Sequence, residues 1–216
     1  TTLASMIKYP NFAYESNKKF SVFLTEKEIF DMIFTELGLF VTGEQGKKYL
    51  RHPLSFLMEA ADDICYALID IVDAIELNIV EINEAIPLYE RILGKVKIEE
   101  IISNSILNDT RKVSKLTALS MNELTLCAGN LFNKNIDRFL NKNEVRKIKS
   151  LIELDTELSD SITTFKNFAR KHIFSENNKR KLEIAANKIL GDLLEHFVDA
   201  VIDLDKNEED KISHKS

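Results

Sequence analysis

Several side chains that could bind a metal ion or a sugar fall on one face of the segment between residues 51 and 76. On a helical wheel at about 100° per residue they lie within roughly 100° of arc, and they are Glu59, Asp62, Asp63, Tyr66, Asp70 and Asp73. Nearly every other residue between Phe56 and Ile75 is apolar, which predicts a helix that is packed on most of its sides. The acidic residues are therefore expected to form a narrow seam along a cleft or polar cavity.

Carboxylates placed this close together repel one another, and burying them is costly unless a positive charge or hydroxyl donors lie nearby. A divalent metal ion, or a ligand rich in hydroxyl groups, would remove that cost. The spacing Asp62-x-x-x-Tyr66-x-x-x-Asp70 sets three polar tips along roughly 12 Å of one helix, so one end could hold a metal while the other binds a sugar. The pattern alone slightly favours the alternative, an acidic stripe that faces solvent.

The elements that position this seam are predicted to be long helices. The chain has 216 residues, of which 44% are hydrophobic and 30% charged, a balance typical of folded proteins rather than disordered ones. It contains only 6 glycines and 3 prolines, too few for the many tight turns of a β-sandwich or barrel. An all-α fold is predicted.

Caps and apolar periodicity predict the element boundaries. Residues 1–8 are predicted to end a helix, and residues 11–24 to form an ordered loop with aromatic anchors. A capping box at 25–28 opens a helix that ends at Gly38. Residues 38–50 are expected to form a loop or short turn. His52-Pro53 opens the seam helix, which continues to about Asn78. Further helices are expected near 81–93 and 97–106, from Asp109 or Thr110 toward Phe139, over 143–172 and over 177–203. One helical domain over residues 1–203, with a frayed tail at 204–216, is the economical organisation.

Composition also excludes some classes of partner. The net charge of −6 argues against a broad electrostatic surface for nucleic acid. No apolar run approaches the ~20 residues of a membrane span, and no signal peptide is visible. Cys65 and Cys127 lack metal or disulfide spacing and are read as buried thiols of a cytoplasmic protein. The first residues lack an initiator Met and read like the middle of a helix, so the chain is expected to be part of a longer protein.

The segment RHPLSFLMEAADDICYALIDIVDA resembles the central-helix motif of the HD-domain deoxynucleoside triphosphate triphosphohydrolases. The upstream stretches TLASMIKYP and KKFSVFLTEKEIF are similar to segments of the same family. The resemblance is strong over residues 1–76, which would form the active-site half. It is only general over residues 77–216, of which 77–203 would form a helical extension. It implies a multi-helix HD-domain-type fold that lacks the N-terminal part holding the His-Asp dyad.

The resemblance also implies residue roles. Asp62 would be the last ligand of the metal site, Asp70 would accept a hydrogen bond from the 3′-hydroxyl, and Tyr66 would pack where a 2′-hydroxyl would otherwise sit. The residues implied to contact the triphosphate are Lys8, Tyr9 and one of the two lysines Lys18 and Lys19. An ammonium group is a suitable partner for phosphate oxygens.

The chain departs from the family in one respect. The family's metal site needs two His and a second Asp from an earlier region, and no His-Asp dipeptide occurs here. The 4 histidines show no metal-ligand spacing, and His52 is expected to help start the long helix. No catalytic residue is therefore predicted within the chain, which should be inactive alone. The metal is expected to be Mg²⁺ or Mn²⁺, with iron possible beside histidines.

Three functional hypotheses follow. In the first, the parent protein cleaves a dNTP, possibly dGTP, to a deoxynucleoside and triphosphate, and assembles as a homo-oligomer as the family commonly does. In the second, the chain is a catalytically inactive helical interaction module. In the third, the parent is an HD hydrolase of another phosphate ester, and the sugar contacts of Asp70 would then not matter.

Overall fold

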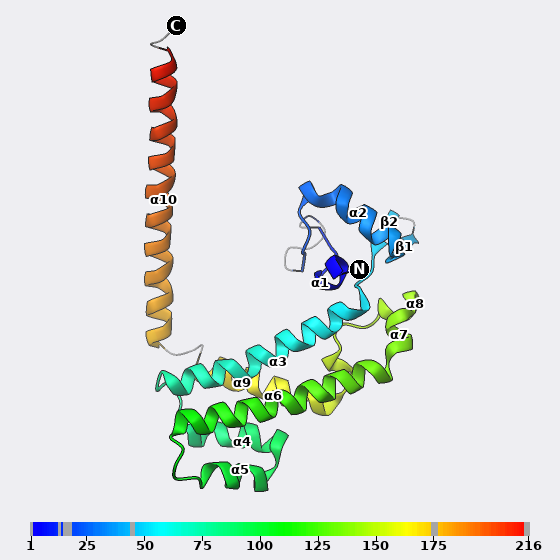
Figure 1. Ribbon diagram of the computed structural model, residues 1–216, viewed down its shortest axis with the longest axis vertical. Coiled ribbons are helices and arrows are strands. Elements are labelled where there is room, and N and C mark those ends of the chain that lie inside the picture. Colours follow the sequence, from blue (N-terminus) through cyan, green and yellow to red (C-terminus); the bar gives the residue numbers. More distant parts are fainter. Residues whose placement is uncertain (1, 13, 15–18, 44–45, 174–176, 214–216) are drawn as a thin grey trace. The chain divides into compact units, whose positions relative to one another are not determined.

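The computed structural model describes residues 2–12, 14, 19–43, 46–173 and 177–213 (Figure 1). The chain divides into two compact units, Thr1–Ala169 and Arg170–Ser216, which are described separately. Helices dominate both units, and within the described residues the sheet is a single two-stranded hairpin. The all-α prediction is confirmed.

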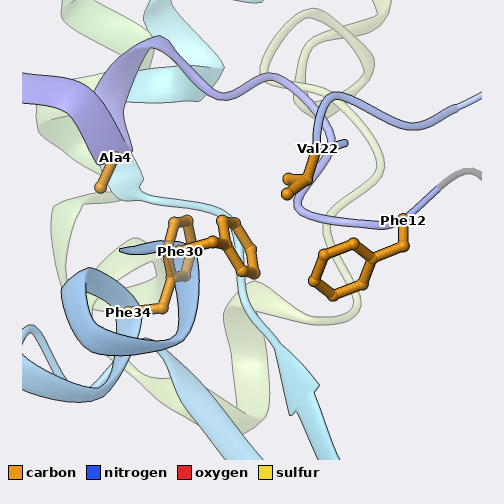
Figure 2. Packing of buried hydrophobic residues seen from close by; sticks show 5 residues of the cluster. All are labelled: Ala4, Phe12, Val22, Phe30 and Phe34. Atoms are coloured by element: carbon orange, nitrogen blue, oxygen red, sulfur yellow. The ribbon is translucent and has the colours of Figure 1, made fainter. Parts of the chain in front are cut away.

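The first unit begins with a small aromatic core that anchors the N-terminal segment. The next elements after helix α1 (Thr2–Met6) are the 3₁₀ turn η1 (Leu24–Glu26) and helix α2 (Lys27–Glu36). Figure 2 shows the buried cluster that holds these pieces together, made of Ala4, Phe12, Val22, Phe30 and Phe34. A parallel bridge joins Phe12 to Val22, and the stacked rings of Phe30 and Phe34 lie 4.2 Å apart. Of the aromatic anchors predicted for residues 11–24, only Phe12 is confirmed among the described residues, because Tyr14, Phe20 and Phe23 are exposed.

The predicted capping box at residues 25–28 is wrong by two residues. The Glu26 carboxylate accepts a hydrogen bond from the Phe23 N–H (3.1 Å), and α2 starts at Lys27 without a side-chain cap. The 3₁₀ turn displaces the cap because it satisfies backbone donors one turn earlier than an α-helix would. The predicted end is confirmed, since Gly38 follows α2 with φ of 63°, the left-handed conformation that glycine tolerates best.

Residues 38–50 form more than the predicted loop. Strand β1 (Phe40–Gly43) pairs antiparallel with β2 (Gly46–Tyr49), with Phe40 opposite Tyr49. The Tyr49 ring packs edge-on against Phe30, with centroids 4.7 Å apart, and its hydroxyl donates to Asp31. Both contacts come from α2, so the hairpin depends on packing that its own sequence does not show.

Helix α3 (Pro53–Glu76) is the central element of the first unit. His52 caps it as predicted, because its Nδ1 accepts a hydrogen bond from the Leu54 N–H (3.2 Å), and Pro53 occupies the first helical turn. One face of α3 is buried through Phe56, Ala60, Ile64, Leu68 and Ile71. It packs against α6 (Asp109–Lys134), which runs beside it in Figure 1. The predicted seam helix therefore exists and is held from behind.

The remaining elements pack around α3 and α6 or continue the chain after them. They are α4 (Ile82–Leu93), α5 (Lys95–Ile102), α7 (Ile136–Leu140), α8 (Lys142–Val145), the turn η2 (Ile152–Leu154) and α9 (Thr156–His172). The cap of α6 is Asn108, whose side chain accepts from the Arg111 N–H (2.9 Å), rather than Asp109 or Thr110. The long predicted helix toward Phe139 is interrupted at Asn135, so α6 and α7 are separate.

The second unit is dominated by helix α10 (Asn177–Ser213), which continues beyond the predicted end at residue 203. Apolar side chains of this helix line a groove, and they are Leu190, Leu193, Leu194, Phe197, Val198, Val201 and Ile202. The assignment of residues 1–203 to one domain stays a prediction. None of the described helices combines the length and hydropathy needed to cross a bilayer.

Candidate functional site

The acidic seam of α3 is partly open to solvent and partly buried. The Asp62 side chain is 45% exposed and Tyr66 is 64% exposed, whereas Glu59 is only 7% exposed. Asp70 is half-buried. The seam is therefore neither a fully solvated stripe nor a closed cavity, because its buried end lies against the N-terminal segment and its other end is accessible.

Asp62 is paired with a lysine from the N-terminal segment. The Lys8 Nζ donates a hydrogen bond to Asp62 Oδ2 at 2.8 Å. Lys8 lies just beyond α1, which packs against α3 and so brings the two side chains together. Partial burial lowers the pKa of Lys8, but the hydrogen bond to Asp62 and the nearby Tyr9, Asp62 and Glu59 outweigh it, so the pKa is raised overall. The ammonium group stays charged at neutral pH.

Glu59 lies one turn before Asp62 and has two partners. Arg51 Nη2 approaches Glu59 Oε2 at 2.8 Å, an ion pair whose alignment falls short of a hydrogen bond. The Tyr9 hydroxyl donates to Glu59 Oε1 at 3.2 Å. Burial raises the pKa of Tyr9, and the charge of Glu59 raises it further. The phenol is therefore a fixed donor and the carboxylate a fixed acceptor.

Three cationic groups surround the ring of Tyr9. Lys8 Nζ lies 5.7 Å, Lys19 Nζ 5.3 Å and the Arg51 guanidinium 5.8 Å from its centroid. These distances are in the range of cation–π attraction. The cations converge on one aromatic ring beside α3 and could contact an anion with several negative oxygens.

Asp63 belongs to a separate contact. Lys166 from α9 donates to Asp63 Oδ1 at 2.5 Å, across 103 residues of sequence. This ion pair joins α9 to α3. The helical wheel grouped Asp63 with Asp62, but the two carboxylates have different partners. No local signal in the sequence points to Lys166, because the partners come from distant helices.

The predicted triphosphate residues Lys8 and Lys19 both lie near the Tyr9 ring, and Lys8 also contacts Asp62. Lys18 lies outside the described residues. Tyr66 and Asp70 follow Asp62 at one-turn intervals on α3, as predicted. Sequence reasoning missed Arg51 and gave no role to Glu59, although Glu59 already fell within the wheel's polar arc.

The described residues do not by themselves form a complete metal site. Within residues 2–213 and outside the gaps, no group of three or more His, Cys, Asp or Glu is arranged to hold an ion. His52 caps α3, and the Nδ1 of His196 lies 2.8 Å from the Asp192 carbonyl oxygen. Asp62 could supply one carboxylate ligand, and any further ligands would have to come from elsewhere in the protein.

Sequence comparison identifies relatives. No family model matches the chain. It is 27% identical to a deoxyguanosinetriphosphate triphosphohydrolase-like protein of Synechocystis sp. over 216 aligned positions, which cover 94% of this chain and 46% of that protein. The corresponding protein of Pseudomonas aeruginosa is 28% identical, with the same coverage.

A protein of Serratia proteamaculans named deoxyguanosinetriphosphate triphosphohydrolase is 26% identical over 83% of this chain and 36% of its own length. The chain thus spans about half the length, or less, of the curated relatives it matches. The resemblance indicated by the α3 motif is confirmed: this chain is similar over most of its length to proteins named deoxyguanosinetriphosphate triphosphohydrolase or deoxyguanosinetriphosphate triphosphohydrolase-like.

Proposed function

We propose that the chain is part of a dNTP triphosphohydrolase, which cleaves a dNTP, with dGTP the first candidate, to a deoxynucleoside and inorganic triphosphate. The observation that carries the proposal is the convergence of Lys8, Lys19 and Arg51 on the Tyr9 ring, together with the contact of Lys8 with Asp62. The names of the relatives and the α3 motif support it.

In this proposal the triphosphate contacts the N-terminal segment. Lys8 and Lys19 are charged donors that lie 5.7 and 5.3 Å from the centre of the Tyr9 ring, and compact ammonium groups suit the oxygens of a polyphosphate. Cations already in place before the reaction stabilise the negative charge that develops when the ester bond to the α-phosphorus breaks. The chain's contribution is to bind and orient this end of the nucleotide.

The deoxyribose would lie further along α3. Tyr66 and Asp70 follow Asp62 at one-turn steps of about 5–6 Å, a reach that matches one nucleoside placed beside a triphosphate. The Asp70 carboxylate would accept a hydrogen bond from the 3′-hydroxyl. The Tyr66 ring would fill the space that a 2′-hydroxyl needs, so the site would prefer deoxyribonucleotides.

The rest of the active site would come from outside this chain. Asp62 would contribute one ligand to a divalent metal, Mg²⁺ or Mn²⁺ with iron possible, since hard oxygen ligands suit these ions. A homo-oligomer and a cytoplasmic location are further parts of the proposal. The chain alone is expected to bind but not to hydrolyse.

The test is a nucleotide panel with the full-length protein. Each dNTP and its ribonucleotide counterpart are incubated with added Mg²⁺ or Mn²⁺, and deoxynucleoside and triphosphate are quantified. We expect the two products in equal amounts, from dNTPs in preference to ribonucleotides. Asp70→Ala should reduce kcat/KM about tenfold to 100-fold, as expected for a lost hydrogen bond to a charged group.

Glu76→Ala is the matched control, because it removes a carboxylate from the exposed end of the same helix and should leave activity near that of the wild type. Activity that survives Asp70→Ala would favour a hydrolase of another phosphate ester. No triphosphate release from any nucleotide would favour the inactive interaction module.

A further inference from the structure

Arg51 occupies a junction between three parts of the first unit. It follows strand β2 and precedes α3, and its side chain is 13% exposed. Its Nη1 donates to the Lys149 carbonyl at 3.0 Å and its Nη2 lies 2.8 Å from Glu59 Oε2. The guanidinium also stacks 3.9 Å from the centroid of Phe56. A planar guanidinium with this many contacts has little rotational freedom, so it fixes whatever it binds.

Glu59 transmits this fixed position to the N-terminal segment. Its side chain is 9% exposed, and its two oxygens face different partners, Oε2 toward Arg51 and Oε1 toward Tyr9. A buried carboxylate is tolerated only when its oxygens are compensated. Loss of either partner would therefore displace Glu59 or admit water.

Tyr9 in turn places both lysines. Lys8 precedes it in the chain, and the Tyr9 carbonyl accepts from the Asn11 N–H (2.8 Å). The Asn11 side chain donates to the Lys19 carbonyl (2.9 Å), and the Tyr9 N–H donates to Ser21 Oγ (3.3 Å). The position of the Tyr9 ring is thus linked to the backbone on both sides of the loop that carries the two lysines.

We propose that Arg51 and Glu59 are positioning residues that fix Tyr9 and thereby aim Lys8 and Lys19 at the anionic end of the ligand. The anionic ligand rests on the proposed function, whereas the positioning itself does not. Arg51 and Glu59 act through Tyr9 and need not touch the ligand.

The direction in which Glu59→Gln changes the affinity for an anion separates a positioning role from a purely electrostatic one. Glu59→Gln removes a negative charge near the lysines, so a through-space effect alone would tighten the binding of an anion. Positioning predicts the opposite, because the amide no longer holds Arg51 and Tyr9 in place. Asp63→Asn is the control: it also removes one negative charge from α3, but Asp63 pairs with Lys166 on α9, so the Arg51–Glu59–Tyr9 and Lys8–Asp62 contacts stay intact.

The experiment uses this chain and two readouts. Hydrogen–deuterium exchange measures the order of residues 7–12 and 19–22, and titration calorimetry with inorganic triphosphate measures affinity. We expect Glu59→Gln to accelerate exchange in residues 7–12 and to weaken triphosphate binding about fivefold, the equivalent of one lost hydrogen bond. Asp63→Asn should leave exchange at residues 7–12 unchanged and should not weaken triphosphate binding.

The proposal is overturned if Glu59→Gln leaves exchange at residues 7–12 unchanged and binds triphosphate as well as the wild type or better. Should Glu59→Gln fail to fold, Tyr9→Phe replaces it, because Tyr9→Phe removes only the hydroxyl and keeps the ring. Exchange at residues 7–12 and triphosphate affinity then decide in the same way. If the wild-type chain does not bind triphosphate, the proposed triphosphate site fails, and the exchange measurement alone decides the positioning role.

Discussion

Lys8 Nζ and Asp62 Oδ2 lie 2.8 Å apart although the residues are 54 positions apart in the chain. The pair joins the segment after α1 to the acidic face of α3. The repulsion expected among the carboxylates of α3 is thereby relieved by the protein's own cations, Lys8 at Asp62, Arg51 at Glu59 and Lys166 at Asp63.

Lys8→Met is expected to weaken binding of inorganic triphosphate to this chain about tenfold, because a charged donor is lost at the proposed anion site. Titration calorimetry at low and high ionic strength measures the effect, which should shrink as salt screens the charge. Lys27→Met is the matched control, since Lys27 also pairs with an aspartate, Asp31 at 3.1 Å, but lies on α2. Equal losses for both variants would show that only the net charge matters.

His52 should make stability depend on pH. Burial lowers the pKa of His52 below its usual value of 6.5, and its Nδ1 must be unprotonated to accept from Leu54 N–H. Below about pH 6.5 the unfolded chain therefore binds a proton that the folded chain resists, and the unfolding free energy falls as pH falls.

Denaturant unfolding at pH 7.5 and 5.5 checks this. His52→Asn keeps a capping oxygen that does not titrate, so it should lose less stability on acidification than the wild type. His52→Ala should cost about 1 kcal/mol at pH 7.5. A wild-type pH dependence that His52→Asn leaves unchanged would contradict the prediction.

Leu68 and Ile69 test which face of α3 is buried. Leu68 is fully buried, while the adjacent Ile69 is 45% exposed. Leu68→Ala should lower the unfolding free energy by about 2–5 kcal/mol, because it removes transfer energy and leaves a cavity. Ile69→Ala removes a side chain of similar size and should cost much less. Similar costs from chemical denaturation would mean that α3 is rotated relative to α6.

Tyr89 should make the fold sensitive to strong alkali. Its hydroxyl lies 2.8 Å from Thr117 Oγ1, and burial raises its pKa to about 12. Between the ordinary value of 10 and about 12 the unfolded chain loses this proton before the folded chain does, so stability falls as pH rises. Tyr89→Phe should reduce that slope while costing about 1–2 kcal/mol at neutral pH, because the Thr117 hydroxyl loses its partner. An unchanged slope would show that other groups cause it.

Short-range interactions made much of the fold predictable. The seam helix could be predicted because its apolar period, His52 and Pro53 all lie within the segment itself. The end of α2 at Gly38 follows from one local backbone conformation. The α3 motif also indicated the resemblance to the triphosphohydrolases. Helical spacing alone placed Asp62, Tyr66 and Asp70 on one face.

The sequence alone determined that the fold is helical, where the seam helix lies, its polar face and the family resemblance. Only the tertiary structure decided how the acids on that face are paired and that residues 40–49 form a hairpin. The contacts that pair the acids join separate segments, and they are Arg51–Glu59–Tyr9, Lys8–Asp62 and Lys166–Asp63. The packing of Tyr49 on Phe30 brings β2 against α2. Such contacts depend on which surfaces meet after folding, and no local pattern encodes that.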